Sequence, residues 1–311
     1  MKSGIIGIDV GGTNIKAALV LGRKIIGRSR RATLAKAGAQ HTIRQIKSTI
    51  EPLQKEAHSI SIGIAGIIDS QNGVVKYSPN LKGWNDIPLA TILHKEFNLP
   101  THVLNDVDAI CLGEWKYGVA RGHDNVFLFT LGTGVGGAAI CEGKLLFGAN
   151  RFAGEFGHTT INWKGPKCVC GHHGHLERYV GAKYIVALAK KKMRVRKSSL
   201  SQYSVLTPEI IARAAKGADN VAIEVFAEIG YYIGIGVANI LALFDPDIVV
   251  ITGGIARAGR ILFDPVRKSV KQLVLGASMR HYRIVAARLG DDAGILGAAL
   301  FAQMKRKQEK T

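Results

Sequence analysis

Two stretches of the chain follow one pattern: IGIDVGGTNIKAALVLGRKIIG at residues 6–27 and LFTLGTGVGGAAICEGKLLFG at residues 128–148. Each holds an apolar run, a glycine-rich turn, a second apolar run and a further turn, which is typical of a β-hairpin that continues into a third strand. A shift of 121 residues superimposes Gly11 on Gly132, Ala17 and Ala18 on Ala138 and Ala139, Gly22 on Gly143, and Gly27 on Gly148. We therefore predict an internal duplication, with two α/β lobes that begin with the same hairpin.

Strands and helices alternate after each hairpin. Residues 41–57 have helical spacing that Pro52 should kink or divide, and residues 59–66 read as a strand. A strand over 101–106 ends in Asp106, and a helix over 107–118 follows with Asn105 or Asp106 as its cap. In the second lobe we predict helices over 182–191, 208–216 and 222–244, a strand over 247–254, and a last helix over 291–307. These boundaries predict a small domain at 1–118, to which 292–311 returns, and a large domain at 119–291.

Composition excludes several classes of protein. No run of eighteen apolar residues and no signal-peptide pattern occurs, so we expect a cytoplasmic protein without a membrane partner. Cys111 and Cys141 stand alone among apolar residues, as buried free thiols do. The 42 Lys and Arg against 23 Asp and Glu give a net charge of +19. No aromatic residues interleave the basic stretches, which favours solvated surfaces over a specific nucleic-acid site.

Three glycine loops follow predicted strands, at 9–14, 131–137 and 252–254. Small residues there let backbone N–H groups approach phosphate oxygens, so we expect a nucleotide gripped between the lobes. The GxGxxG at 132–137 precedes a strand instead of the helix that a dinucleotide fold needs, and no GxxxxGK[ST] occurs. The dinucleotide and P-loop interpretations therefore fail.

Residues 154–181, GEFGHTTINWKGPKCVCGHHGHLERYVG, gather two glutamates, four histidines and two cysteines. Imidazole and thiolate are zinc ligands. By itself the segment is compatible with a catalytic metal centre or with a structural metal that holds a loop.

The order of DVGGTN, GIAG, YSPNLKGW, NDVDA, TLGTGVGG, GANRFAGEFGH, CVCGHHGHLE and ITGG resembles the ROK family, most of all its bacterial glucokinase branch. The resemblance covers essentially the whole chain. It implies an α/β, two-lobed actin-like ATPase (ribonuclease H-like) fold and transfer of the γ-phosphoryl group of ATP to a hexose hydroxyl, with glucose first. It implies Asp106 as the general base, and the expected sugar contacts are Asn80, Asn105, Asp106, Glu155, His158 and Glu177.

The resemblance also implies residues for ATP, Mg²⁺ and Zn²⁺. Asp9 would orient Mg²⁺ or its water, because magnesium prefers oxygen ligands. The expected nucleotide contacts are Asp9, Gly11, Gly12, Thr13, Asn14, Lys16, Gly132, Thr133, Gly134, Gly253 and Gly254. Many family members carry Lys where this chain has Asn14. The expected zinc ligands are His158, Cys168, Cys170 and His175; four protein ligands leave no open position, so this zinc would be structural. His175 replaces the family's usual cysteine, and His172 and His173 compete for the fourth position.

Two alternatives to a glucokinase stay open. An N-acetylmannosamine kinase is one, since Asn14 also follows GGT in those enzymes. The other is a sugar-responsive repressor, which the basic charge would suit. Such repressors carry a helix-turn-helix before the first glycine loop, and the start of that loop at Asp9 leaves no room for one in this chain. For the enzyme we expect a homodimer.

Overall fold

The computed structural model describes residues 4–308, and the chain divides into two compact units. Unit 1 comprises residues 1–122, 145–153 and 288–311, and unit 2 comprises residues 123–144 and 154–287. Residues 145–153, which we had expected in the second lobe, thus group with the first. Residues 1–3 and 309–311 of the predicted small domain lie outside the described residues.

Unit 1 is built on a five-stranded sheet with the order β3-β2-β1-β4-β8. Its strands are β1 (Gly4–Val10), β2 (Asn14–Leu21), β3 (Lys24–Ala32), β4 (Ala57–Ile64) and β8 (Thr101–Asn105). The first three strands pair antiparallel, whereas β1, β4 and β8 pair parallel. Alternate side chains leave opposite faces of a strand. Ile6 and Ile8 accordingly enter one apolar core and Ile5 enters another.

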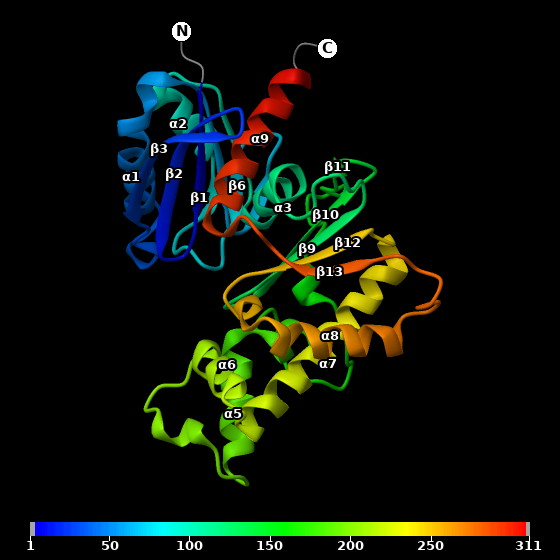
Figure 1. Cartoon of the computed structure of the whole chain (residues 1–311). Coiled ribbons are helices and arrows are strands. Elements are labelled where there is room, and N and C mark those ends of the chain that lie inside the picture. The colour runs from blue at the N-terminus through cyan, green and yellow to red at the C-terminus, as the bar shows by residue number, and fades with distance from the viewer. Residues whose placement is uncertain (1–3, 309–311) are drawn as a thin grey trace. The chain divides into compact units, whose positions relative to one another are not determined.

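Helices cover both faces of this sheet (Figure 1). The core on the Ile6 face includes buried residues of α1 (Ala39–Ile50) and α2 (Leu89–Phe97), and the core on the Ile5 face includes those of α9 (Ala293–Gln308). The remaining elements of unit 1 are α3 (Asp106–Tyr117), a small sheet of β5 (Ile67–Asp69), β6 (Val74–Tyr77) and β7 (Asn85–Ile87), and 3-10 turns at Ala35–Ala37, Glu51–Glu56 and Gly290–Asp292. The helix predicted over 41–57 is thus divided at Pro52, as expected, but Ala57 was wrongly included because it starts β4.

Unit 2 repeats the sheet order as β11-β10-β9-β12-β13. Its strands are β9 (Val126–Leu131), β10 (Val135–Cys141), β11 (Lys144–Leu145), β12 (Ile248–Thr252) and β13 (Arg283–Ala286). The predicted duplication is therefore present, but its uniform shift of 121 is wrong beyond the first turn. Val10 pairs with Ile15, whereas Leu131 pairs with Val135, so the second loop is one residue shorter. A one-residue change of alignment would turn each side chain to the other face of the sheet. The buried and exposed positions of β2 match those of β10 when the two strands are aligned with a shift of 120 residues.

The helices of unit 2 are α4 (Glu177–Val180), α5 (Ala182–Met193), α6 (Pro208–Lys216), α7 (Asn220–Phe244) and α8 (Arg260–Leu273), with 3-10 turns at Phe156–His158, Ser199–Gln202 and Ile255–Ala258. Among the described residues, α7 is the one helix long and apolar enough to cross a membrane. It packs on α8, where a Cβ on Gly234 would lie 2.4 Å from the Ser269 Cβ, and 61% of its most apolar window is buried. These are the surroundings of a core helix.

Glycines let α3 and α9 approach each other closely. A Cβ on Gly297 would lie 1.7 Å from the carbonyl oxygen of Ala109, and a Cβ on Gly113 would lie 2.2 Å from that of Ala293. Neither position can accept a methyl group unless a helix moves. Because α3 begins with Asp106, this contact also fixes where the candidate base lies in unit 1.

We predict that Gly297→Ala lowers the free energy of unfolding by at least about 2 kcal/mol, since overpacking against backbone cannot be relieved by a rotamer change. Urea denaturation would measure the loss. Gly217→Ala is the matched control, because a Cβ there meets no atom closer than 3.4 Å and its φ of −84° suits alanine. Equal stability of the two variants would contradict the packing argument.

Candidate active site

Asp106, the predicted base, and Asp9, the predicted magnesium contact, lie at one edge of the unit 1 sheet. Asp9 is near the end of β1 and pairs in register with Gly63 of β4, and the next residue, Ile64, pairs with Asn105 at the end of β8. Because β1, β4 and β8 are parallel, their carboxyl ends meet at the same edge, where ligands bind in open α/β sheets. Gly63 keeps the edge open, since a Cβ there would lie 2.9 Å from the Ala109 Cβ and 3.5 Å from the Asp106 Cα.

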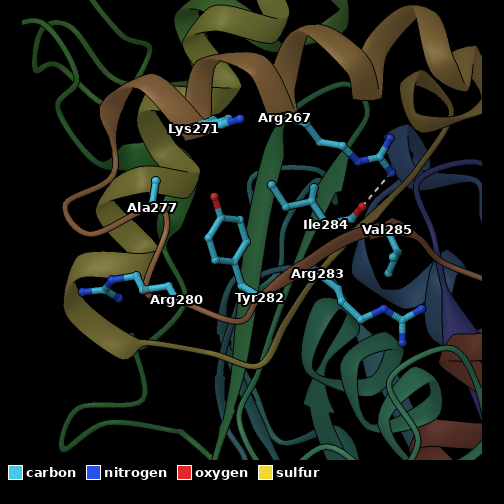
Figure 2. Close-up of a pocket in the computed structure, with 8 residues that line it drawn as sticks. All are labelled: Arg267, Lys271, Ala277, Arg280, Tyr282, Arg283, Ile284 and Val285. Atoms are coloured by element: carbon cyan, nitrogen blue, oxygen red, sulfur yellow. Dashed lines mark hydrogen bonds between the residues drawn. The ribbon is translucent and has the colours of Figure 1, made fainter.

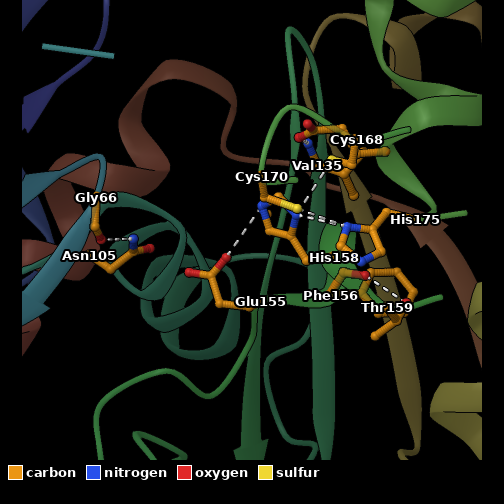
Figure 3. Close-up of polar contacts among 12 residues, drawn as sticks. Gly66, Asn105, Val135, Glu155, Phe156, His158, Thr159, Cys168, Cys170 and His175 are labelled. Carbon is orange, nitrogen blue, oxygen red and sulfur yellow. Dashed lines mark hydrogen bonds and ion pairs between the residues drawn. The ribbon is translucent and has the colours of Figure 1, made fainter. Parts of the chain in front are cut away.

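Asp106 is the first residue of α3, and Asn105 is its N-cap. The Asn105 Oδ1 accepts hydrogen bonds from the backbone N–H groups of Val107 (2.7 Å) and Asp108 (3.3 Å). Figure 3 shows its Nδ2, which donates to the Gly66 carbonyl at 3.0 Å. The Asp106 carboxylate also accepts from the Val107 N–H at 3.0 Å. Of the two caps we considered, the structure selects Asn105. The half-buried carboxylate of Asp106 thereby keeps a fixed place on the first turn of a helix.

Asp9 is surrounded by protein and by two other charges. Burial raises the pKa of its carboxyl from 3.8 to about 6; the Lys16 ammonium opposes the rise and the Asp291 carboxylate adds to it. Lys16 Nζ lies 2.9 Å from an Asp291 oxygen. A Cβ on Gly294, in the first turn of α9, would lie 3.2 Å from the Asp9 Cγ. Asp9 is therefore held in an environment that disfavours its charge, as functional carboxylates often are.

The first glycine loop is braced by its neighbours. The Gly11 N–H donates to the Asn14 carbonyl at 3.0 Å, and the Thr33 hydroxyl donates to the Gly11 carbonyl at 2.6 Å. Gly12 and Thr13 are exposed at the tip. Asn14 accepts a hydrogen bond from the Arg30 Nε at 3.2 Å, and Lys16 is paired with Asp291. The tip of the loop is thus free of side chains that would bar the approach of a phosphate.

The other two loops follow adjacent parallel strands of unit 2. Thr130 of β9 and Thr252 of β12 pair in register, so the loop at 132–134 and the pair Gly253–Gly254 leave the same sheet edge. Gly253 has a φ of +95°, and a Cβ there would lie 2.2 Å from the Leu131 carbonyl oxygen. In the loop at 132–134, Thr133 is exposed between two half-buried glycines. The predicted loops therefore gather in two groups, one on each unit.

The predicted sugar contacts of unit 2 lie close to one glycine loop or to each other. Glu177 accepts a hydrogen bond from the Val135 N–H at 3.0 Å, and a Cβ on Gly134 would lie 2.5 Å from the same oxygen. Glu155 is exposed, with its carboxylate 4.0 Å from the His158 Nε2 (Figure 3). In unit 1, Asn80 is exposed on the turn between β6 and β7.

Four side chains form a Cys/His cluster. The ligand atoms of His158, Cys168, Cys170 and His175 all lie within 4.8 Å of one another. The two histidine Nδ1 atoms are 3.3 Å apart, His175 Nδ1 is 3.3 Å from the Cys170 sulfur, and His158 Nδ1 is 3.9 Å from the Cys168 sulfur (Figure 3). Tetrahedral zinc, with bonds of about 2.0 Å to nitrogen and 2.3 Å to sulfur, spaces its ligand atoms roughly 3.3–3.8 Å apart. The donor set and its spacing therefore fit zinc, and His175 is the fourth member.

A tight loop brings these four residues together. The Cys168 N–H donates to the His172 carbonyl at 2.6 Å, and the Gly174 N–H donates to the Pro166 carbonyl at 3.0 Å. Gly174 has a φ of +69°, and a Cβ there would lie 1.6 Å from the Asn162 carbonyl oxygen. His175 is buried directly after this turn, whereas His172 and His173 are exposed. The turn thus selects which histidine enters the cluster.

The structure adds residues that the sequence had not singled out. Asp291 pairs with Lys16, and Asp292 accepts two hydrogen bonds from the Arg28 guanidinium at 2.6 and 2.9 Å. The signal was the pair of acidic residues at the start of the last predicted helix. Their partners on β2 and β3 lie more than 260 residues earlier, a pairing that no local pattern reveals.

One cavity and one basic stretch lie away from the predicted site residues. A cavity of about 460 Å³ lies between α8 and β13, and its lining includes Arg267, Lys271 and Tyr282 but none of the predicted site residues (Figure 2). The basic stretch at 190–197 is partly neutralised, because Lys192 lies 3.0 Å from Glu228 and Arg196 pairs with Glu224. Some of the excess charge is therefore engaged in ordinary surface ion pairs.

We predict that Asp9→Asn stabilises the metal-free protein at pH 8 by roughly 1–3 kcal/mol, given that one pKa unit corresponds to about 1.4 kcal/mol. The folded pKa is raised, so the wild type loses stability as pH rises from about 4 through about 6, and the asparagine variant avoids this loss. Urea midpoints at several pH values, without nucleotide or magnesium, would measure the difference.

Asp69→Asn is the control, because its expected effect on stability at pH 8 is opposite to that of Asp9→Asn. Hydrogen bonds, first from the Asn72 side chain, lower the pKa of Asp69, so its substitution should cost stability above the unfolded pKa. A benefit from Asp9→Asn that stays constant from pH 4 to pH 8 would contradict the assignment of a raised pKa to Asp9.

Comparisons with known proteins agree over most of the chain. The chain is 37% identical over 306 residues to a glucokinase from Thermotoga maritima, covering 96% of each protein. It is 35% identical over 242 residues to a xylose repressor from Caldicellulosiruptor bescii, covering 76% of this chain and 60% of the repressor. The structure of a ROK family glucokinase from Streptomyces griseus in complex with glucose and AMPPNP matches 97% of this chain and 100% of its own, with 32% identity and a TM-score of 0.84.

The two mixed sheets with their shared strand order are those of the actin-like ATPase fold that the resemblance implied. Residues 5–305 match the model of the ROK family. On this match and on the identity to the full-length relatives, the chain belongs to the ROK family.

Proposed function

We propose that this chain transfers the γ-phosphoryl group of ATP to a hydroxyl of glucose, giving glucose 6-phosphate. The observation that carries the proposal is the pair Asp9 and Asp106 at the shared edge of the parallel strands β1, β4 and β8, in a chain that aligns with nearly the whole length of a glucokinase. Phosphoryl transfer needs positioning and charge stabilisation more than covalent catalysis, together with a carboxylate that accepts the hydroxyl proton.

Asp106 takes the role of general base. Its carboxylate accepts the proton of the attacking sugar hydroxyl, while the Asn105 cap holds the helix start on which it stands. Glu155, His158 and Glu177 hydrogen-bond sugar hydroxyls, and Asn80 and Asn105 add amide contacts. Carboxylates suit this task because a hexose offers neighbouring O–H donors.

Asp9 and the glycine loops serve the nucleotide. Gly11, Gly12 and Thr13, and likewise Gly132, Thr133 and Gly134, offer backbone N–H groups and hydroxyls to phosphate oxygens, and Gly253 and Gly254 add a third loop. Asn14 and Lys16 contribute polar groups from the start of β2. Asp9 would hold Mg²⁺ or one of its waters, and with a pKa near 6 its carboxyl is mostly ionised at neutral pH. Mg²⁺ held there would neutralise negative charge on the phosphates.

One alternative concerns the sugar that is phosphorylated, and the other concerns whether the chain is an enzyme or a repressor. Asn14 after GGT keeps N-acetylmannosamine in view as the sugar. A repressor is less well supported, since the chain is 37% identical to the glucokinase over 306 residues and 35% identical to the repressor over only 242. Sequence-specific DNA binding at physiological salt would favour the repressor. We further propose that the protein is a cytoplasmic homodimer. Light scattering at several protein concentrations would test the oligomeric state.

We predict that Asp106→Asn and Asp106→Ala both lower kcat by roughly 10²–10⁴-fold, the usual contribution of a general base, with sugar affinity largely retained. A coupled ADP-release assay across glucose, mannose, glucosamine, N-acetylglucosamine and N-acetylmannosamine would measure turnover and rank the sugars.

The two substitutions separate catalysis from helix capping. Asparagine keeps an oxygen that can accept from the Val107 N–H but cannot serve as the base, whereas alanine loses both. Stability should therefore fall more in the alanine variant than in the asparagine variant. A near-normal kcat in either variant would contradict the assignment of Asp106 as the general base.

We predict that the purified protein carries about one zinc per chain, bound by the Cys/His cluster as a structural ion. His175→Ala should lose the metal and lower the melting temperature, because an open ligand position weakens the site. His172→Ala, which changes a neighbouring exposed histidine, should keep the bound zinc and leave the melting temperature unchanged. Elemental analysis and thermal melts would measure these effects; a metal-free protein with full activity would count against the ion.

A further inference from the structure

Glu114 is a buried carboxylate for which the proposed mechanism so far has no role. It lies on α3, two turns after Asp106, and its side chain is fully buried. Burying a charged group is costly unless hydrogen bonds replace its water. Glu114 accepts three of them from backbone N–H groups: Val119 at 2.9 Å to Oε2, and Arg288 at 2.8 Å and Leu289 at 2.7 Å to Oε1.

The three amides belong to two of the four segments that connect the units. The first stretch of unit 1 ends at Gly122 and its last stretch begins at Arg288, with residues 145–153 between them. Val119 therefore lies on the first segment that leaves unit 1, and Arg288 and Leu289 are the first residues of the last segment that returns to it. The backbone carbonyl of Glu114 adds to the anchor, because it accepts from the N–H groups of Gly118 and Ala120, both at 3.1 Å. One residue therefore fixes both segments.

The returning segment leads directly to charged groups of the candidate site. Leu289 is followed by the turn Gly290–Asp292, in which Asp291 pairs with Lys16 at 2.9 Å. Gly294 then meets the Asp9 side chain at the start of α9. In the other direction along the chain, α3 runs back from Glu114 to Asp106. The carboxylate of Glu114 is thus connected through short, hydrogen-bonded stretches to both Asp9 and Asp106.

A glycine makes room for this carboxylate. A Cβ on Gly118 would lie 1.9 Å from the Glu114 Oε2, and the φ of Gly118, −105°, is open to other residues. The requirement for glycine here is consequently steric and comes mainly from the Glu114 side chain, with the Glu114 Cα at 2.8 Å as a further contact. A methyl group at Gly118 would displace the carboxylate, and to a lesser extent the end of α3, while leaving the charge in place.

We propose that Glu114 is a positioning residue for phosphoryl transfer, whose carboxylate fixes the outgoing segment at Val119 and the returning segment at Arg288 and Leu289. This role rests on the proposed kinase function. Segments that connect compact units take up the backbone changes when the units move, and substitutions in them alter turnover without touching the substrate. Glu114 gives both segments one fixed end.

The test compares Glu114→Gln and Gly118→Ala with Leu93→Ala. Glutamine has the shape of glutamate, but its amide group would face at least one backbone N–H as a second donor. Leu93 is fully buried on α2, away from both segments, so its truncation lowers stability alone. Kinetics are measured well below the lowest melting temperature of the set, so that every variant is folded.

We expect Glu114→Gln and Gly118→Ala to lower kcat about tenfold or more with the glucose KM within about threefold, while Leu93→Ala changes kcat less than about twofold. A similar kcat loss in Leu93→Ala would reduce the effect to stability and overturn the proposal. So would a normal kcat in a folded Glu114→Gln variant. If Glu114→Gln does not fold, the kcat of Gly118→Ala, compared with that of Leu93→Ala, decides whether the proposal stands.

Hydrogen exchange supplies a readout that needs no kinase activity. The amides of Val119, Arg288 and Leu289 should exchange slowly in the wild type and faster in Glu114→Gln, with exchange in α1 unchanged. Unaltered exchange at these three amides would refute the anchor itself. A wild type that releases no ADP with any sugar would refute the role in phosphoryl transfer, while exchange still reports on the anchor.

Discussion

Parallel pairing of β4 between β1 and β8 is the constraint on which the candidate chemistry of unit 1 depends. It brings the ends of three strands to one edge, so that Asp9 and Asn105 lie beside consecutive residues of the strand between them. Gly63, one of these two residues, lacks the side chain that would crowd Ala109 and the backbone of Asp106. The same arrangement recurs in unit 2, where parallel β9 and β12 place two glycine loops at one edge.

Stability and the proposed function are opposed at Asp9. Burial and the nearby Asp291 raise the pKa of its carboxyl, so the folded state would be more stable if this group were neutral, yet the proposed binding of magnesium requires the charge. Lys16 lessens the conflict without removing it. The N-terminus of α9 closes this environment through Gly294, and α9 in turn is held by its glycine contact with α3. The packing of the last helix therefore sets the electrostatics of a residue near the start of the chain.

Only some of the histidines in residues 154–181 belong to the Cys/His cluster. The turn around Gly174 buries His175 and leaves His172 and His173 exposed. His158 turns its Nδ1 toward the cluster and its Nε2 toward Glu155. A structural metal bound there would hold His158 by one ring nitrogen and leave the other for a hydrogen bond, so under the proposed function the ion would orient side chains that contact the sugar.

The sequence by itself determined the repeated hairpins, many of the strands and helices and the three glycine loops, because apolar periodicity and glycine turns are local signals. It did not indicate α2, α8 or β13, and the candidate residues came from the resemblance to the ROK family. It did not determine the length of the second hairpin turn, the choice of His175 over its neighbours or the use of Asn105 as the cap. Nor could it find the contacts of Asp291 with Lys16, or of Glu114 with Arg288 and Leu289, across more than 170 residues. Those depend on which groups the packed sheets and helices bring within hydrogen-bonding distance, and this is a property of the tertiary structure alone.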